Sequence, residues 1–135
     1  MEKYILEKDI KVFCVTAESF PDGILAAFQK VHSLIPDSYS RTTFGISFPD
    51  RSGNIIYKAA VEESFEGEAE KLGCESFTIE KGEYLSILIK NYMKDIPRIG
   101  KAFQTLISDP RIDPNGVCVE KYLNANDLLC LVKIN

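Results

Sequence analysis

The chain has 135 residues, a formal net charge of −4 and an ordinary 45% share of hydrophobic residues. This length and composition predict one globular domain over residues 1–135. Its cations are scattered among acids, which argues against direct nucleic-acid binding because phosphate neutralisation needs clustered cations. No apolar run approaches the roughly 18 residues of a membrane span, so we expect no membrane partner.

The first half of the chain predicts a strand, a helix and two further strands. The β-branched and aromatic residues of 9–17 are typical of a strand. One apolar helix face is predicted by four residues at spacings of 4, 3 and 4: Ile24, Phe28, Val31 and Ile35. The segments TTFGISF (42–48) and IIYKAAVEE (55–63) predict strands on either side of a turn.

The second half predicts two strands, a helix and two more strands. The acidic segment 64–75 is interpreted as a linker or a loop with a short helical turn. The strands SFTIE (76–80) and EYLSILIKNY (83–92) follow, and Asp95 is a candidate N-cap for the second helix. The last predicted strands are VCVEKYL (117–123) and LLCLVKI (128–134).

The two halves repeat the same order of elements. The tripeptide AFQ lies in both predicted helices, with Phe28 and Phe103 separated by 103 − 28 = 75 residues. A strand–helix–strand–strand order around each copy indicates an internal duplication, with pseudo-repeats at about 1–63 and 75–135. Phe28 and Phe103 are then expected to be equivalent core residues.

A carboxylate breaks this symmetry. Aligning the turn residues Asp50 and Asn124, at an offset of 124 − 50 = 74, matches Ile46 with Glu120. Since side chains alternate along a strand, Glu120 shares a face with Cys118 and Tyr122. Burial would raise the pKa of such a carboxyl, and perturbed acids are candidate functional groups. The competing interpretation is a solvated strand face, with Lys121 next to the acid.

The cysteines and the histidine do not predict a metal site. Cys14, Cys74, Cys118 and Cys130 form no CxxC pair, and His32 is the chain's one histidine. The start of the chain, MEKYILEKDI, mixes charged and apolar residues and is not typical of a signal peptide. We therefore expect reduced thiols in a cytoplasmic protein.

Three short motifs, in order along the chain, carry a family resemblance: GISFPD (45–50), KGEYLSILIKNY (81–92) and VEKYLN (119–124). With them the chain resembles, over nearly its whole length, the GyrI-like small-molecule-binding domains, which also serve as effector-binding domains of bacterial transcription regulators. The resemblance implies an α+β fold of duplicated βαββ modules. Their curved antiparallel sheet would carry two helices on one face and a ligand cleft on the other.

The resemblance also implies a binding site. The functional acid of the family falls on Glu120, with Tyr122 beside it, and weaker ligand-binding candidates are Tyr84, Phe44, Phe48 and Tyr57. Aromatic faces and a desolvated carboxylate suit apolar or cationic ligands. The chain departs from the family pattern in having no Trp and in lacking the Gly-Pro that often opens the second helix.

We expect a stand-alone effector-binding domain with a regulatory or sequestering role, no DNA-binding part, no cofactor and no catalytic residue. Its partners would be a small-molecule ligand and a regulatory protein. The alternative that the resemblance implies is a hydrolase, since some members of the family use the same glutamate, with a nearby aromatic hydroxyl, to open reactive cyclopropane-type compounds. A third interpretation is a partner domain whose cleft is filled by its own side chains, because fold does not imply function.

Overall fold

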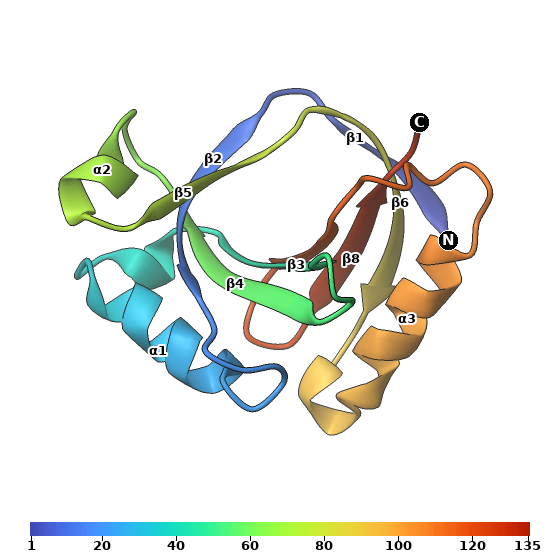
Figure 1. The fold of residues 1–135 in the computed structure, drawn as a ribbon, viewed down its shortest axis with the longest axis horizontal. Helices are drawn as coiled ribbons and strands as arrows, with labels where there is room; N and C mark the ends of the chain where they lie inside the picture. Colours follow the sequence, from blue (N-terminus) through green and yellow to red (C-terminus); the bar gives the residue numbers. More distant parts are fainter. The chain divides into compact units, whose positions relative to one another are not determined.

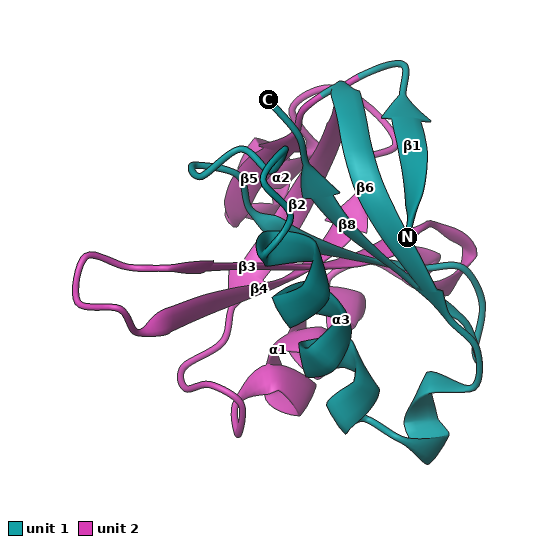
Figure 2. Ribbon diagram, turned by 90° about the vertical axis from the view of Figure 1, so that its right-hand side faces the viewer, with its two compact units in different colours: residues 1–8, 81–135 teal, residues 9–80 magenta.

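The computed structural model of the chain describes residues 1–135 and divides them into two compact units. Unit 1 comprises residues 1–8 and 81–135, and unit 2 comprises residues 9–80 (Figure 2). Each unit has an antiparallel sheet with a helix packed on one face (Figure 1).

Unit 2 is built on one strand–helix–strand–strand module. Its sheet has the strand order β3-β4-β2-β5. The strands and helices are β2 (Ile10–Thr16), α1 (Ile24–Ser33), η1 (Ser38–Ser40), β3 (Thr43–Pro49), β4 (Ile55–Glu62), α2 (Glu68–Leu72) and β5 (Glu75–Ile79). The short helix α2 lies within the acidic segment where a helical turn was predicted.

Unit 1 repeats the module. Its sheet has the strand order β1-β6-β8-β7. The strands and helices are β1 (Glu2–Leu6), β6 (Gly82–Ile89), η2 (Tyr92–Lys94), α3 (Pro97–Ile107), β7 (Cys118–Tyr122) and β8 (Leu128–Lys133). No helix of the chain is long and apolar enough to cross a membrane.

The two modules have the same topology. In each, the last strand lies between the other two: β4 between β2 and β3, and β8 between β6 and β7. The antiparallel strands, the helices and the paired βαββ modules confirm the predicted α+β fold. The flanking strands cross between halves of the sequence, because β1 pairs with β6 and β5 pairs with β2.

The AFQ repeat has a packing explanation. Ala27 of α1 and Ala102 of α3 are both buried, where a small side chain lets the helix approach its sheet. Phe28 packs against the core of unit 2 and Phe103 belongs to the core of unit 1. The expectation that the two phenylalanines are equivalent core residues is confirmed.

Helix α3 begins later than predicted. Its N-cap position is Ile96, with no side-chain hydrogen bond, and Pro97 opens the helix. Asp95 is therefore not the N-cap. Proline is well suited to the first helical turn, where its missing N–H has no intrahelical partner in any case. Strand β6 also ends early, at Ile89, so that residues 90–96 form a loop between β6 and α3.

Candidate ligand-binding site

Glu120 lies on the helix-covered face of the unit 1 sheet. In the strand register, Glu120 is opposite Cys130, and Cys130 is opposite Ile87 of β6. Cys130 belongs to the buried cluster that contains Phe103 and Leu106 of α3, and Tyr122 packs against that cluster. The sequence-based site put Glu120 in a cleft opposite the helices. The strand register instead places its side chain on the α3 side.

The predicted match between Ile46 and Glu120 is also wrong, by one residue. The two hairpins close through equivalent backbone bonds, from Asp50 N to Asn54 O (2.7 Å) and from Leu123 N to Asp127 O (3.0 Å). The offset is therefore 123 − 50 = 73, and Ser47 occupies the place of Glu120. A slip of one residue moves every side chain of a strand to the other face.

The carboxylate of Glu120 is held among aromatic rings. Its residue is 9% exposed, and Tyr122 Oη donates a hydrogen bond of 2.8 Å to Glu120 Oε1. The ring of Tyr92 meets that of Tyr122 edge to face, with centroids 5.6 Å apart and planes inclined by 69°. Edge-to-face contact is a favoured geometry for aromatic pairs. Strand β7 and the loop before α3 thus bring an acid and two phenols together.

Two neighbours of Glu120 have raised pKa values. Burial, and next the charge of Glu120, raise the pKa of the Cys130 thiol to about 12. The same two causes, in the same order, raise the pKa of the Tyr92 phenol. Both groups are therefore neutral near pH 7, which leaves Glu120 as the acid of the cluster. The expected rise in the pKa of Glu120 itself stays a prediction.

Tyr92 contacts the candidate site, and the sequence analysis did not identify it. It was assigned to the end of a predicted strand, yet it lies in η2, where its N–H donates to Asn126 O at 3.0 Å. The strand pattern ends at Ile89, and an aromatic residue follows just before a helix. An aromatic residue between the end of a strand pattern and a helix is the sequence feature that could have identified Tyr92.

Tyr84 lies on the opposite face of the same sheet. It pairs with Tyr4 and Lys133, while its neighbour Leu85 belongs to the α3 core. Lys121 also faces this side, with its Nζ 3.3 Å from the hydroxyl of Tyr4. The structure therefore separates Tyr84 from Glu120 by the thickness of the sheet.

The remaining predicted residues belong to unit 2. Tyr57 faces α1 and contacts two further rings, stacking on Phe20 at 6.1 Å and meeting Phe28 edge to face at 6.0 Å. Phe44 and Phe48 point to the opposite face of that sheet, as the register with β4 requires. Of the six predicted residues, Glu120 and Tyr122 are in direct side-chain contact, and a ligand role for all six stays a prediction.

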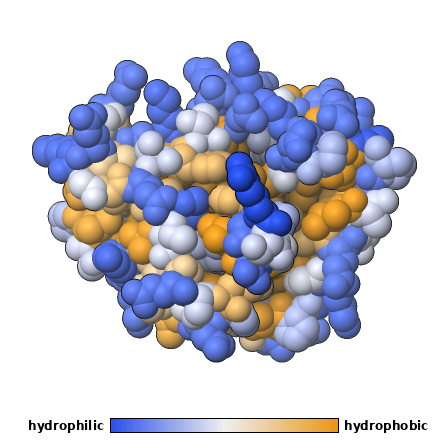
Figure 3. Space-filling view, viewed as in Figure 1, coloured by the Kyte–Doolittle hydropathy of each residue, from blue (hydrophilic) through white to orange (hydrophobic).

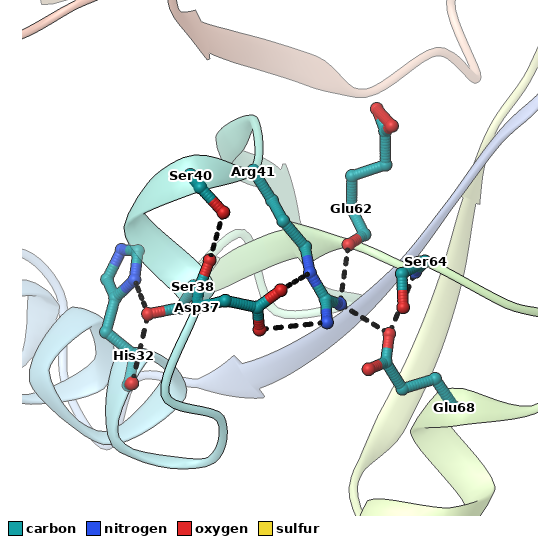
Figure 4. Close-up of polar contacts among 8 residues, drawn as sticks. All are labelled: His32, Asp37, Ser38, Ser40, Arg41, Glu62, Ser64 and Glu68. Atoms are coloured by element: carbon teal, nitrogen blue, oxygen red, sulfur yellow. Dashed lines mark hydrogen bonds and ion pairs between the residues drawn. The ribbon is translucent and has the colours of Figure 1, made fainter.

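A second buried glutamate lies in unit 2 and has a cationic partner (Figure 4). Arg41 Nη1 lies 2.6 Å from Glu68 Oε1, which also accepts the N–H of Ser64 at 2.9 Å. The same guanidinium reaches the carboxylate of Asp37 at 3.1 Å and the carbonyl of Glu62 at 3.4 Å. This network joins the loop around η1 to the start of α2, which is a structural role.

The contact between His32 and Ser38 does not build a nucleophile. Ser38 Oγ lies 2.8 Å from His32 Nδ1, but the hydroxyl donates its proton to the His32 carbonyl at 3.1 Å (Figure 4). An activated serine needs its proton directed at the base. An open hollow elsewhere in unit 2 is lined by Asp9, Lys11, Glu62 and Phe65 and holds none of the predicted site residues.

Exposed apolar residues surround the loop that carries Tyr92. Met93 and Ile96 flank it in sequence, and Leu123 lies in the turn that accepts its backbone bond. Figure 3 shows that apolar side chains are visible among hydrophilic ones on the surface. The loop that carries Tyr92 and the β7–β8 turn therefore expose apolar side chains to solvent.

No protein-family model and no curated protein matches this sequence. Solved structures do match. An integron cassette protein of Vibrio cholerae, VCH_CASS2, is 11% identical with a TM-score of 0.72, over 99% of this chain and 95% of its own. SAV2435, solved bound to tetraphenylphosphonium, is 12% identical with a TM-score of 0.68, over 100% and 94%.

A third similar structure is a hydrolase from Listeria innocua. It is 12% identical with a TM-score of 0.62, and the match covers 99% of this chain and 91% of that one. Each match spans nearly the whole of both chains, while identities of this size show the fold alone. The chain therefore shares its complete fold with a protein that binds a small molecule and with a hydrolase.

Proposed function

We propose that this chain is a small-molecule-binding domain of the GyrI-like kind, and that unit 1 holds apolar or cationic ligands beside Glu120. One observation carries the proposal: a buried carboxylate accepts a hydrogen bond from Tyr122, whose ring contacts that of Tyr92. In a structural core, a carboxylate among aromatic and thiol groups is costly to bury. A ligand cation would recover part of that cost.

The physical chemistry of the cluster favours lipophilic cations. Aromatic faces attract cations through their quadrupoles, and this attraction grows where water is excluded. When ionised, the carboxylate of Glu120 would attract a cation in a low-dielectric setting, where charge complementarity is stronger than in water. Tetraphenylphosphonium, the ligand of SAV2435, combines a positive charge with four phenyl groups. It is a suitable probe for this chain.

The biological role that follows is that of an effector-binding domain. We propose that it acts in a bacterial cytoplasm, either by sequestering such compounds or by reporting them to a regulatory protein. The resemblance of the motifs around β6 and β7 to the GyrI-like family supports this role. Direct nucleic-acid binding forms no part of it, because the cations of the chain are scattered among acids.

The test compares two ions of one shape and opposite charge. Isothermal titration calorimetry would measure tetraphenylphosphonium and tetraphenylborate against the wild type, Glu120→Gln and the control Glu83→Gln. Glu83 lies in the same sheet with an exposed side chain, so its replacement changes the net charge and removes only a surface ion pair with Lys3. We expect the wild type and the control to prefer the cation. We expect Glu120→Gln to lose about tenfold in cation affinity, or about 1.4 kcal/mol.

Equal cation affinity in Glu120→Gln and the wild type, with both proteins folded, would refute the charge role of Glu120. A preference for tetraphenylborate in the wild type would refute the proposed ligand class. Circular dichroism and the melting temperature, measured on each variant, identify any loss that arises from unfolding. The three proteins together separate local charge from net charge.

A hydrolase is the second candidate, and the bond between Tyr122 and Glu120 favours it. A carboxylate with a phenol 2.8 Å away can accept a proton from water while the phenol orients the reactants. The oxygen of that water would add to a strained ring carbon, and the ring bond would break with its electron pair taking up a proton. Incubation of a reactive cyclopropane in H₂¹⁸O tests this. A product carrying ¹⁸O, formed by the wild type but not by Glu120→Gln, supports hydrolysis, and unchanged substrate excludes it for that compound.

A further inference from the structure

The loop that carries Tyr92 is closed at its base by one side chain. Arg98, in the first turn of α3, donates from Nη2 to Lys90 O at 2.7 Å and to Asn91 O at 2.9 Å. These carbonyls follow directly after the end of β6. One guanidinium therefore joins the start of the loop to the helix that follows it.

The guanidinium is held by the carbonyls more closely than by the nearby acid. Arg98 Nε is buried and lacks a hydrogen-bond partner, and it lies 3.8 Å from Asp95 Oδ2. A buried N–H without a partner is unfavourable. The geometry of the side chain is thus set by Lys90 and Asn91 at a cost to its own Nε group.

The backbone of the same loop is in an uncommon conformation. Asn91 has φ 53° and ψ 50°, in the left-handed region that non-glycine residues seldom adopt. It directly precedes Tyr92, and a change of its backbone angles would swing the tyrosine away from Tyr122. Arg98 donates a hydrogen bond to the carbonyl of Asn91 itself. This contact therefore opposes a change in the backbone angles of Asn91.

A second anchor lies across the loop. Tyr92 N donates to Asn126 O at 3.0 Å, and Asn91 N donates to Asp127 Oδ1 at 3.4 Å, both in the turn between β7 and β8. The ring of Tyr92 then contacts Tyr122, the residue that donates to Glu120. Tyr92 is therefore fixed on two sides, by the β7–β8 turn and by Arg98.

We infer that Arg98 is a positioning residue, which holds Tyr92 against Tyr122 and so fixes one aromatic wall of the Glu120 site. The expected effect of Arg98 on Tyr92 follows from the loop contacts alone. Its expected effect on ligands rests on the proposed function. A wall fixed before binding lowers the ordering cost of the complex. Arg98 would then lengthen the residence of a bound ligand without touching it.

The effect on Tyr92 is measured without any ligand. Native-state amide hydrogen exchange would compare Arg98→Ala with the wild type and with the control Arg111→Ala. Arg111 is an exposed arginine of the same unit whose partner is Asp109. We expect the Tyr92 amide to exchange at least about tenfold faster in Arg98→Ala, with the amides of β8 unchanged. Unchanged exchange at Tyr92 would overturn the inference.

The effect on binding is measured with a double-mutant cycle. The dissociation constant of tetraphenylphosphonium would be determined for the wild type, Arg98→Ala, Tyr92→Ala and the double variant. If Arg98 acts through Tyr92, its loss weakens binding about tenfold in the wild type and adds little once Tyr92 is gone. Equal losses in both backgrounds would overturn it. If the wild type binds no such cation, the proposed function fails, while the exchange measurement still decides whether Arg98 positions Tyr92.

Discussion

Two glutamates are buried in this protein, and their partners differ. Glu68 in unit 2 is 3% exposed and lies beside the guanidinium of Arg41. Glu120 in unit 1 is 9% exposed and accepts its hydrogen bond from the neutral phenol of Tyr122. The first acid is neutralised within the fold and ties loops together. The second lies beside a phenol and a thiol, and burial, followed by the carboxylate of Glu120, raises the pKa of Tyr92 and of Cys130.

The largest effect that sharpens this comparison is expected at Arg41. Its replacement by Ala leaves the carboxylate of Glu68 buried without its guanidinium. Breaking a buried ion pair from one side costs about 3–5 kcal/mol. Urea denaturation would measure the free energy of unfolding of Arg41→Ala against the wild type.

The control removes the uncompensated charge. In Arg41→Ala combined with Glu68→Gln, we expect the free energy of unfolding to recover by more than half of the loss. An exposed ion pair contributes less than about 1 kcal/mol to the free energy of unfolding, so a loss of that size in Arg41→Ala alone would indicate an exposed pair. That result would show that the network of Figure 4 does not hold unit 2 together.

A smaller effect is expected at Tyr122. Tyr122→Phe retains the ring and deletes the hydroxyl that donates to Glu120. Loss of a hydrogen bond to a buried charged acceptor should lower the free energy of unfolding by about 1–3 kcal/mol. Denaturation in urea measures it, with Tyr39→Phe as a control because that ring is exposed. A Tyr122→Phe protein as stable as its control would contradict the bond.

The pH dependence of stability separates the two acids further. Burial opposes the ionisation of Glu68, yet hydrogen bonds from Arg41 and from the N–H of Ser64 hold its pKa below the ordinary 4.5. A folded-state pKa that is lowered gives stability which is present above 4.5 and is lost as the pH falls through the folded value. Urea midpoints between pH 3 and pH 7 measure this loss. We expect it to be absent in Glu68→Gln.

The smallest effect is expected at His32. Burial lowers its pKa from 6.5, so that the folded protein favours the neutral ring. Its contribution to stability is therefore present above pH 6.5 and declines as the pH falls below that value. We expect a loss under about 1 kcal/mol, because the ring is partly solvated and stacks on exposed Tyr39. A His32→Gln protein with the same slope between pH 7 and pH 5.5 would contradict this.

The elements of the fold could be predicted from local patterns. The helix over Ile24–Ser33 follows from apolar spacing, and β3, β4, β7 and β8 follow from runs of β-branched and aromatic residues. Strand β1 could not be recognised, because it is only five residues long, begins with two charged residues, and pairs with β6, which is distant in sequence. No local sequence pattern predicts that β1 pairs with β6 or that β5 pairs with β2.

The face of Glu120 could not be predicted because two turn residues look alike. Asp50 Oδ1 accepts the N–H groups of Ser52 and Asn54, and Asn124 Oδ1 accepts those of Asn126 and Asp127. These similar bonds suggest equivalent positions. The backbone bonds that close the two hairpins give an offset of 73 residues, one less than the offset between these turn residues. Because side chains alternate along a strand, an error of one residue places Glu120 on the opposite face of the sheet. Glu120 and Tyr122 still share one face, because residues two apart in a strand move to the other face together, and their ligand role stays a prediction.

The most direct test of the account is to locate a bound cation by nuclear magnetic resonance. Backbone and tyrosine resonances would be followed as tetraphenylphosphonium is added to the ¹⁵N- and ¹³C-labelled chain, with tetraphenylborate added to a second sample. We expect the cation to shift the resonances of Glu120, Tyr122, Tyr92 and Cys130 at low concentrations, and we expect no such shift with the anion. Shifts confined to other residues, or identical shifts with both ions, would contradict the assignment of Glu120 as the ligand's charged contact.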